Sequence, residues 1–301
     1  MRISIHKTKN LLLLSEKKTY FRSLGKKLKP IYQMVSKITG GLTEKILTLK
    51  ILNKYDVDYF KCLETGFIQT EEPYWLAESY SSAITKLDVG LVERNELLRN
   101  RIIPILAKYF NTDNLFLDYA GGYGIFTRMM RDKGYNFFHT DIYCDNLFAE
   151  FFDLSDLTIN SKFELVTAFE VFEHLPNPIS EIEKILEYSN NLLFTTVLHP
   201  GFDKLQDWWY LIPETGQHVS LYSENSLNYI AEKFGLNFYT DGEGVHLFTD
   251  KSFAINPLTP AKLPYVIRTM KRKVDRYFRK VDGIKESLLQ KDWSFIKTKL
   301  S

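Results

Sequence analysis

The chain has 301 residues, of which 45% are hydrophobic and 25% are charged, a balance typical of a globular protein with one sizeable core or two domains. Its longest aliphatic run near the start, residues 11–14, is too short for a membrane span or a secretory signal. Its two cysteines, Cys62 and Cys144, cannot form a disulfide framework, so we expect a cytoplasmic protein.

Charge is distributed unevenly along the chain. Residues 1–29 and 262–301 each carry a net charge of +8, whereas residues 30–261 carry −14. Between 266 and 284, apolar residues recur at helical spacing among basic ones, which predicts an amphipathic basic helix. We expect the basic ends to pack on the acidic body, with peripheral membrane contact as the alternative.

Four regions follow one another along the chain. Residues 1–35 form a basic extension, and residues 36–75 form a small β-rich module with strand-like runs separated by Gly and Asn. A helix is expected over 91–110 despite Pro104, because its apolar residues recur at helical intervals. The main domain covers 76–255, and a basic helical tail covers 256–301.

The main domain alternates between strand-like and helix-like segments. The strand-like runs are 115–118, 136–140, 163–168, 192–198, 237–240 and 245–249, and the helix-like ones are 125–134, 177–189 and 226–235. This alternation predicts an α/β fold, with a mostly parallel, Rossmann-like sheet and helices on both faces.

Three glycines lie in the turn between the first of these strands and its helix. Gly121, Gly122 and Gly124 follow Asp118, and glycine there lets the backbone approach a ligand beside free N–H groups. Asp141 ends the second strand, where a carboxylate reaches ribose hydroxyls. Because an acid leads the glycines, the pattern favours a cationic ligand over a pyrophosphate.

This arrangement resembles the class I S-adenosylmethionine-dependent methyltransferases over residues 90–250. Asp118 with the glycines resembles the first motif, Asp141 the second, and Asp153 in "FFDL" the acid that faces the adenine amino group. Ala120 replaces the first glycine of the family pattern, which still permits close approach if its φ is negative. The resemblance implies S-adenosylmethionine as cofactor and cofactor contacts from Tyr80, Asp118, Ala120, Gly121, Gly122, Gly124, Asp141, Ile142, Asp153, Leu154, Phe169 and Glu170.

A stretch rich in aromatic residues, 207–223, is expected over the cofactor. Trp208, Trp209 and Tyr210 form either an acceptor platform or a cover for the core. His218 is the expected general base, because a neutral imidazole can take a proton from an acceptor hydroxyl. The stretch resembles a bacterial branch of the family associated with sugars, which implies a glycan or nucleotide-sugar acceptor.

Glu170, Glu173 and His174 form an E-x-x-E-H pattern that places them close together. With His218 they can bind a divalent cation, or they can make local hydrogen bonds. We expect the second, with His174 catalytic beside His218 and no metal bound.

The N-terminal module contains two frames that match the knuckles of a zinc ribbon, a feature that the resemblance to sugar-modifying methyltransferases implies. Ser36 and Thr39 precede Gly40, and Cys62 and Thr65 precede Gly66, so three of the four ligand positions lack sulfur. Hydroxyls are poor zinc ligands, and we expect no structural zinc there.

The leading function is therefore O-methylation of a sugar, glycan or other small-molecule hydroxyl. An RNA methyltransferase that uses the basic ends is the second hypothesis, although the acidic body makes a nucleic-acid partner unlikely on charge grounds. The third is a cofactor-binding assembly partner without catalysis.

Overall fold

The structure, a computed structural model, describes residues 34–80, 85–157, 161–259 and 289–300. All of the described residues belong to one compact unit. The basic extension and the helix expected at 266–284 thus lie outside the described residues. Within the described ranges, every helix is too short or too polar to cross a membrane.

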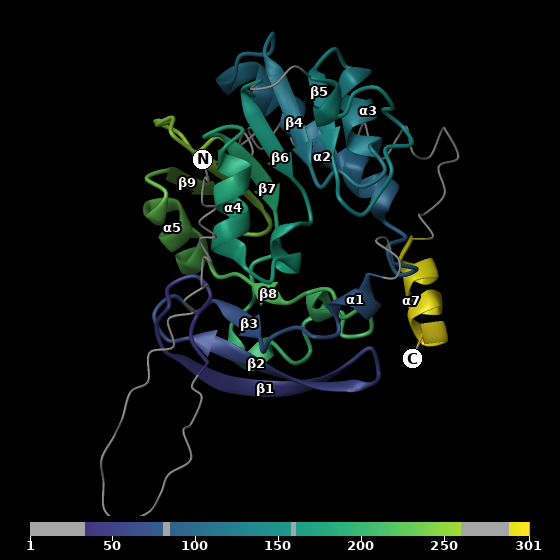
Figure 1. The fold of residues 1–301 in the computed structure, drawn as a ribbon, viewed down its shortest axis with the longest axis vertical. Coiled ribbons are helices and arrows are strands. Elements are labelled where there is room, and N and C mark those ends of the chain that lie inside the picture. Colours follow the sequence, from purple (N-terminus) through teal and green to yellow (C-terminus); the bar gives the residue numbers. More distant parts are fainter. Residues whose placement is uncertain (1–33, 81–84, 158–160, 260–288, 301) are drawn as a thin grey trace, which may run out of the picture. The chain divides into compact units, whose positions relative to one another are not determined.

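The larger sheet has six strands in the order β5-β4-β6-β7-β10-β9 (Figure 1). Its first four strands are parallel, and the last two run antiparallel to their neighbours. The sheet confirms the predicted α/β fold, because continuous apolar runs suit strands that are buried on both faces. The strands are β4 (Leu115–Tyr119), β5 (Asn136–Thr140), β6 (Leu165–Ala168), β7 (Leu192–Thr195), β9 (Asn237–Thr240) and β10 (Val245–Thr249).

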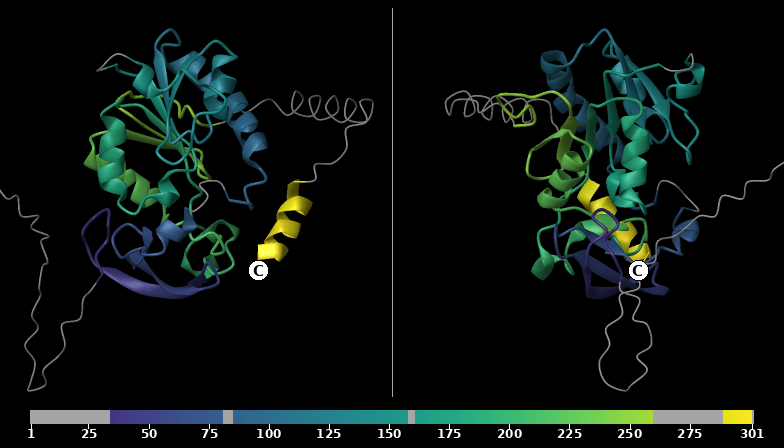
Figure 2. Two further views of the ribbon diagram at one scale, coloured as in Figure 1. Left: turned by 45° about the vertical axis from the view of Figure 1, so that its right-hand side comes forward. Right: turned by 60° about the vertical axis from the view of Figure 1, so that its left-hand side comes forward.

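Helices cover both faces of this sheet (Figures 1 and 2). On one face, α2 (Leu91–Tyr109) and α3 (Ile125–Arg131) pack on apolar side chains of β4, β5 and β10. On the other, α4 (Pro178–Leu186) and α5 (Glu224–Lys233) pack on the alternate side chains of the strands. The helix α5 begins where Ser223 caps it, its hydroxyl accepting from Ser226 N at 3.1 Å.

The smaller sheet has the strand order β1-β2-β3-β8. The predicted strands of the N-terminal module are β1 (Thr43–Ile51), β2 (Tyr55–Cys62) and β3 (Ile68–Thr70), while β8 (Ser220–Leu221) comes from the loop after β7. This two-residue strand was not predicted, because it is too short to show a pattern. It pairs antiparallel with β3 and places residue 218 beside the N-terminal module.

Shorter elements complete the described chain. They are the helices α1 (Leu76–Ser79) and α7 (Leu289–Leu300) and the 3-10 turns η1 (Leu154–Asp156), η2 (Phe172–His174), η3 (Phe202–Lys204) and η4 (Trp209–Leu211). Lys297 of α7 forms an ion pair with Glu214 at 3.1 Å. The domain boundaries that we drew at 35, 75 and 255 stay a prediction.

Two turns of the N-terminal module share one hydrogen-bond pattern. In each turn the N–H of the first residue donates to the carbonyl five residues later, and the carbonyl of the first residue accepts from the N–H of the glycine four residues later. The four bonds are Ser36 N to Gly41 O, Gly40 N to Ser36 O, Cys62 N to Phe67 O and Gly66 N to Cys62 O. Gly40 and Gly66 have φ values of 72° and 76°, which only glycine adopts easily. The two frames noted in the sequence thus have equivalent backbone conformations.

The side chains of these two turns surround one thiol. Cys62 is buried, and its Sγ lies 3.6 Å from Thr39 Oγ1. Burial raises the pKa of this thiol, but hydrogen bonds from Ser36, Thr65 and Thr39 outweigh burial and lower the pKa to about 7. Hydroxyl groups and one thiol therefore occupy the centre of what we call the knuckle pair, Ser36, Thr39, Cys62 and Thr65.

Candidate active site

The carboxyl ends of β4, β5, β6 and β7 meet at one edge of the larger sheet, and the predicted site residues gather there. Asp118 lies near the end of β4, Asp141 follows β5, and Glu170 follows β6. In open α/β sheets this edge is where ligands bind, because strand ends and helix starts leave polar backbone groups there.

The glycine turn after β4 requires glycine for two reasons, close contacts at Gly121 and Gly124 and a positive φ at Gly122 and Gly124. A Cβ on Gly121 would lie 2.5 Å from Asp118 Oδ2 and 2.8 Å from the His139 ring, and Gly122 and Gly124 have φ values of 59° and 81°. Gly122 N donates to Asp141 Oδ2 at 2.9 Å. The turn is therefore fixed by the same carboxylate that we assign to the ribose.

Ala120 has a strained backbone conformation. Its φ is +54°, so the condition under which a small residue replaces glycine without strain, a negative φ, is not met. An L-residue in this left-handed region carries a strain of about 1–2 kcal/mol that glycine would not carry. The turn forces this conformation because β4 must pass directly into the close-packed glycines.

Asp118 lies beneath the turn. It is buried, and its two oxygens accept hydrogen bonds from Thr167 Oγ1 at 2.8 Å and Thr127 Oγ1 at 3.1 Å. Burial raises the pKa of this carboxyl to about 6, with the hydroxyl bonds acting in the opposite direction. Asp118 therefore supports the turn through its hydroxyl partners, and its attraction of a cationic ligand stays a prediction.

His139 is a residue of this site that sequence reasoning missed. It is buried in β5, with Nε2 2.8 Å from Gly122 O and Nδ1 2.9 Å from Asp153 Oδ1. Asn146 Nδ2 also donates to that oxygen, at 3.0 Å. The ring therefore ties the glycine turn to Asp153, and the one signal for it was a polar residue inside an apolar strand.

Beside Asp153, an apolar surface lies open. Ile142 is 85% exposed and Tyr143 is 61% exposed, directly after Asp141. The ring of Tyr80 stacks on that of Tyr143 at 4.9 Å between centroids, while Leu154 begins η1 after Asp153. Exposed apolar side chains of this size indicate a surface that a ligand ring covers.

After β6, the chain turns sharply into the site. Phe169 packs edge-on against Phe126, and Glu170 has a φ of +54°. The hydroxyl of Thr195 accepts from Glu170 N and donates to Glu170 Oε1, both at 2.8 Å. Burial, and then the nearby charge of Glu173, raise the pKa of Glu170 to about 7.

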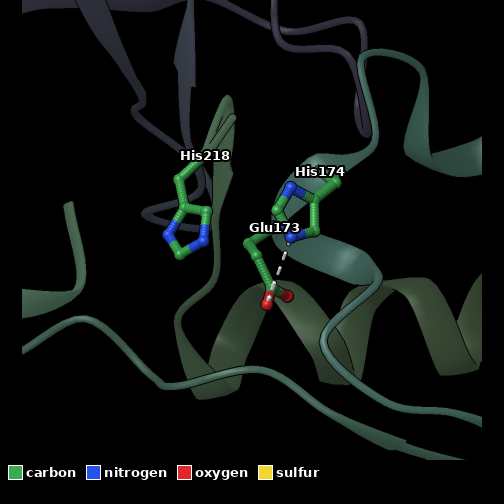
Figure 3. A group of neighbouring side chains, drawn as sticks. All are labelled: Glu173, His174 and His218. Carbon is green, nitrogen blue, oxygen red and sulfur yellow. Dashed lines mark ion pairs between the residues drawn. The ribbon is translucent and has the colours of Figure 1, made fainter. Parts of the chain in front are cut away.

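Three predicted residues form what we call the Glu-His cluster: Glu173, His174 and His218 (Figure 3). One ligand atom from each lies within 4.8 Å of the others, and His174 Nε2 is 4.0 Å from Glu173 Oε1. Glu173 is fully buried, and its pKa is raised to about 7 by burial. The structure thus brings together residues that are 45 positions apart.

Backbone carbonyls orient both imidazoles of the cluster. His218 Nδ1 lies 2.6 Å from Tyr210 O, and His174 Nδ1 lies 3.1 Å from Gln217 O. Because a carbonyl only accepts, each Nδ1 carries the hydrogen and each Nε2 presents a lone pair. Burial lowers the pKa of both rings, that of His218 to about 3, so both are neutral at pH 7.

The rings of Trp208 and Trp209 both contact that of Tyr210, at 5.3 and 5.2 Å between centroids, but the three residues differ in burial. Tyr210 is buried and its hydroxyl donates to Glu173 Oε1 at 2.6 Å, while Trp208 packs partly against the core of the smaller sheet. Trp209 is 61% exposed and lines a surface hollow of about 410 Å³ with Asp203, Lys204 and Asp207. Trp208, which is half-buried, lines the same hollow, so both tryptophans are available as a platform and Trp209 is the more exposed of the two.

Residues 92–240, just under half of the chain, match the family described as "Methyltransferase domain". The sheet order, the glycine turn and this match identify a class I methyltransferase domain, an enzyme domain whose cofactor is S-adenosylmethionine. Among curated protein sequences, none matches the chain significantly.

Solved structures similar to this chain include three methyltransferases. An O-methyltransferase family 2 protein from Planctomyces limnophilus, in complex with apigenin, is 14% identical over 59% of this chain and 62% of its own, with a TM-score of 0.39. Magnesium protoporphyrin IX methyltransferase from Synechocystis, with bound SAH, is 12% identical over 58% of this chain and 92% of its own, with a TM-score of 0.40. An O-methyltransferase family protein from Burkholderia thailandensis is 11% identical over 59% and 68%, with a TM-score of 0.36. The chain thus spans less than two thirds of the first of these proteins.

Proposed function

We propose that the protein transfers the methyl group of S-adenosylmethionine to a hydroxyl of a sugar, glycan or other small molecule. The observation that carries this proposal is the position of Tyr80. Its ring stacks on Tyr143 at the cofactor edge, and the ring of His174 lies 6.2 Å away on its other flank. One side chain, that of Tyr80, therefore lies between the Glu-His cluster and the cofactor surface, where an acceptor must bind.

The cluster supplies the chemistry that oxygen methylation needs. The acceptor oxygen attacks the methyl carbon, the bond from carbon to sulfur breaks, and the sulfur leaves as a neutral thioether while the hydroxyl loses its proton. A lone pair at Nε2 of His174 or His218 can accept a hydrogen bond from that hydroxyl. Glu170 and Glu173, with pKa values of about 7, suit a proton acceptor at neutral pH better than His218, with a pKa of about 3.

Trp209 supports a sugar as the acceptor class. An exposed indole face stacks on sugar rings, and carboxylates such as Asp203 and Asp207 accept hydrogen bonds from sugar hydroxyls. Both acids line the same hollow as Trp209. The Trp209 ring lies 5.2 Å from the buried ring of Tyr210, whose hydroxyl donates to Glu173, so Tyr210 connects the hollow with the cluster.

The test is a screen for transfer of labelled methyl groups to sugar nucleotides, glycans and RNA. We expect transfer to a saccharide, and Trp209→Ala should raise the KM for it by about tenfold through the lost stacking. Tyr74→Ala, which removes another ring that is 61% exposed, is the matched control and should leave the KM unchanged.

Other outcomes of this screen would select the other two hypotheses. Transfer to RNA alone would replace the sugar by a nucleic acid, which the net charge of −14 over residues 30–261 disfavours. Cofactor binding without transfer to any acceptor would indicate an assembly partner. A reducing compartment stays our proposal, since Cys62 and Cys144 are both unpaired thiols.

A further inference from the structure

We infer that Glu173, His174 and His218 form a binding site for one divalent transition-metal ion. Sequence reasoning preferred local hydrogen bonds for these residues. The geometry points to a metal because two imidazole nitrogens and one carboxylate oxygen lie within 4.8 Å of one another (Figure 3). The site itself does not depend on the acceptor, whereas its use in methyl transfer rests on the proposed function.

Both imidazoles are already held as metal ligands are held. A histidine that binds a metal usually donates its other ring N–H to a carbonyl or carboxylate, which fixes the tautomer and the ring. Tyr210 O and Gln217 O serve this purpose for His218 and His174. The two Nε2 lone pairs therefore face the cluster without needing any change of tautomer.

Glu173 provides a second, independent observation. Its side chain is fully buried; Oε1 accepts from the Tyr210 hydroxyl, but Oε2 has no hydrogen-bond partner among the described residues. A buried carboxylate oxygen without a partner destabilises the folded protein, because its desolvation is not compensated. A cation bound between Glu173 and the two imidazoles would remove that destabilisation.

The donor set selects the kind of ion. Two neutral imidazoles with one carboxylate suit Mn²⁺, Fe²⁺, Co²⁺ or Zn²⁺, whereas Mg²⁺ and Ca²⁺ prefer oxygen ligands. Metal bonds of about 2.0–2.2 Å bring donor atoms to about 3.0–3.5 Å from one another. Side-chain rotations must therefore draw the donor atoms that are farthest apart together by about 1.3–1.8 Å.

Three protein ligands leave coordination positions for the acceptor. An ion in this place would bind the acceptor hydroxyl and lower its pKa, and the released proton can pass to Glu170, which lies outside the donor set. A five- or six-coordinate ion keeps two or three open positions, and the site then favours an acceptor that offers a hydroxyl beside a second oxygen, as a vicinal diol of a sugar does.

The experiment is a titration of the full-length, chelator-treated protein with Co²⁺, followed by visible absorption and calorimetry. We expect one Co²⁺ per chain. E173Q, H174Q and H218Q should each weaken binding by at least about 100-fold, and Y210F by about tenfold, because Tyr210 orients Glu173. Neither cofactor nor acceptor is present, so the result is independent of any methyl transfer.

H199Q is the matched control, because both ring nitrogens of His199 already contact backbone groups, Gly66 O and Gly201 N. It should bind Co²⁺ as the unmutated protein does, and every variant should still bind S-adenosylhomocysteine, which checks its fold. The inference is overturned if the unmutated protein binds Co²⁺ no better than an H174Q/H218Q double variant. If H199Q loses Co²⁺ binding as strongly as the cluster variants do, the inference is also overturned, because binding would then not depend on the cluster.

Discussion

The two halves of the site differ in how far their polar groups are paired within the protein. On the cofactor side, Asp118, His139 and Asp153 all have hydrogen-bond partners, and Asp141 accepts from three backbone N–H groups. In the Glu-His cluster, one carboxylate oxygen has no partner among the described residues, and two imidazole nitrogens present lone pairs.

This difference indicates that the cofactor side and the Glu-His cluster contribute to ligand binding in different ways. A surface whose groups are already paired is pre-organised, so it binds its ligand with little rearrangement. The cluster has more lone pairs than hydrogen-bond partners, so we expect a further ligand to bind them. We therefore expect substitutions on the cofactor side to act on cofactor affinity and stability, and substitutions in the cluster to act on metal binding and transfer.

The largest effect on the cofactor side is expected from Gly121→Ala. Its Cβ would overlap Asp118 and His139, so the turn must move, and we expect loss of detectable cofactor binding together with about 1–3 kcal/mol of stability. Gly244→Ala is the control, because its Cβ would meet no atom closer than 3.7 Å. Calorimetry with S-adenosylhomocysteine and thermal unfolding measure both; normal binding by Gly121→Ala would refute a pre-organised turn.

Asp118→Asn should change how stability depends on pH. Since the folded pKa of about 6 exceeds the ordinary aspartate pKa of 3.8, the folded protein keeps this proton to a higher pH than the unfolded chain does. Stability should therefore fall as pH rises from about 4 to about 6, by up to about 3 kcal/mol, and the amide variant should lack this fall. Urea unfolding at several pH values measures it; identical curves for both proteins would contradict the burial argument.

Asp141→Ala should weaken binding of S-adenosylhomocysteine by about 1–3 kcal/mol, because a charged partner of the ribose is lost. Part of this loss comes from the glycine turn, which Asp141 also holds through Gly122 N. Asp145→Ala removes an exposed acid in the same loop and should bind as the unmutated protein does. If Asp141→Ala and Asp145→Ala bind S-adenosylhomocysteine with equal affinity, Asp141 does not contact the cofactor.

The smallest effect is expected from His139→Gln, which can keep one of the two contacts of the ring. We expect about a fivefold weaker cofactor affinity, with kcat at saturating cofactor unchanged, because the residue positions the turn and Asp153. His246→Gln, another buried histidine with two ring contacts, should lower stability without changing the KM for the cofactor. A change in kcat alone would argue against positioning.

Most of the fold could be predicted from the sequence, because apolar runs and helical spacing report burial directly. All the strands predicted in the main domain formed, as did its helices, with ends that differ by a few residues. The strand β8 escaped prediction because its pairing with β3 joins residues about 150 positions apart. Local pattern carries no information about such a contact.

The sequence predicts which residues form the candidate site but not how their side chains contact one another. The glycines and Asp141 were found because their spacing reflects a turn and a strand end. The inward position of Asp118, the positive φ of Ala120 and the link through His139 depend on how side chains from different strands meet. The pairing of Tyr210 with Glu173 likewise appears only when the loop after β7 folds back.

We expect this protein to fold without zinc at the knuckle pair, because three of its four side chains are hydroxyls, which are poor zinc ligands. Its equivalent turns hold hydroxyls around the Cys62 thiol, so hydrogen bonds occupy the place that a metal would take in a set of four cysteines. Replacing Ser36, Thr39 and Thr65 by cysteine should create a thiolate site, visible as a cobalt–sulfur charge-transfer band that the unmutated protein lacks. These three substitutions would thus convert a module that folds without zinc into one that requires it. A cell short of zinc would retain the unmutated protein and lose the triple variant.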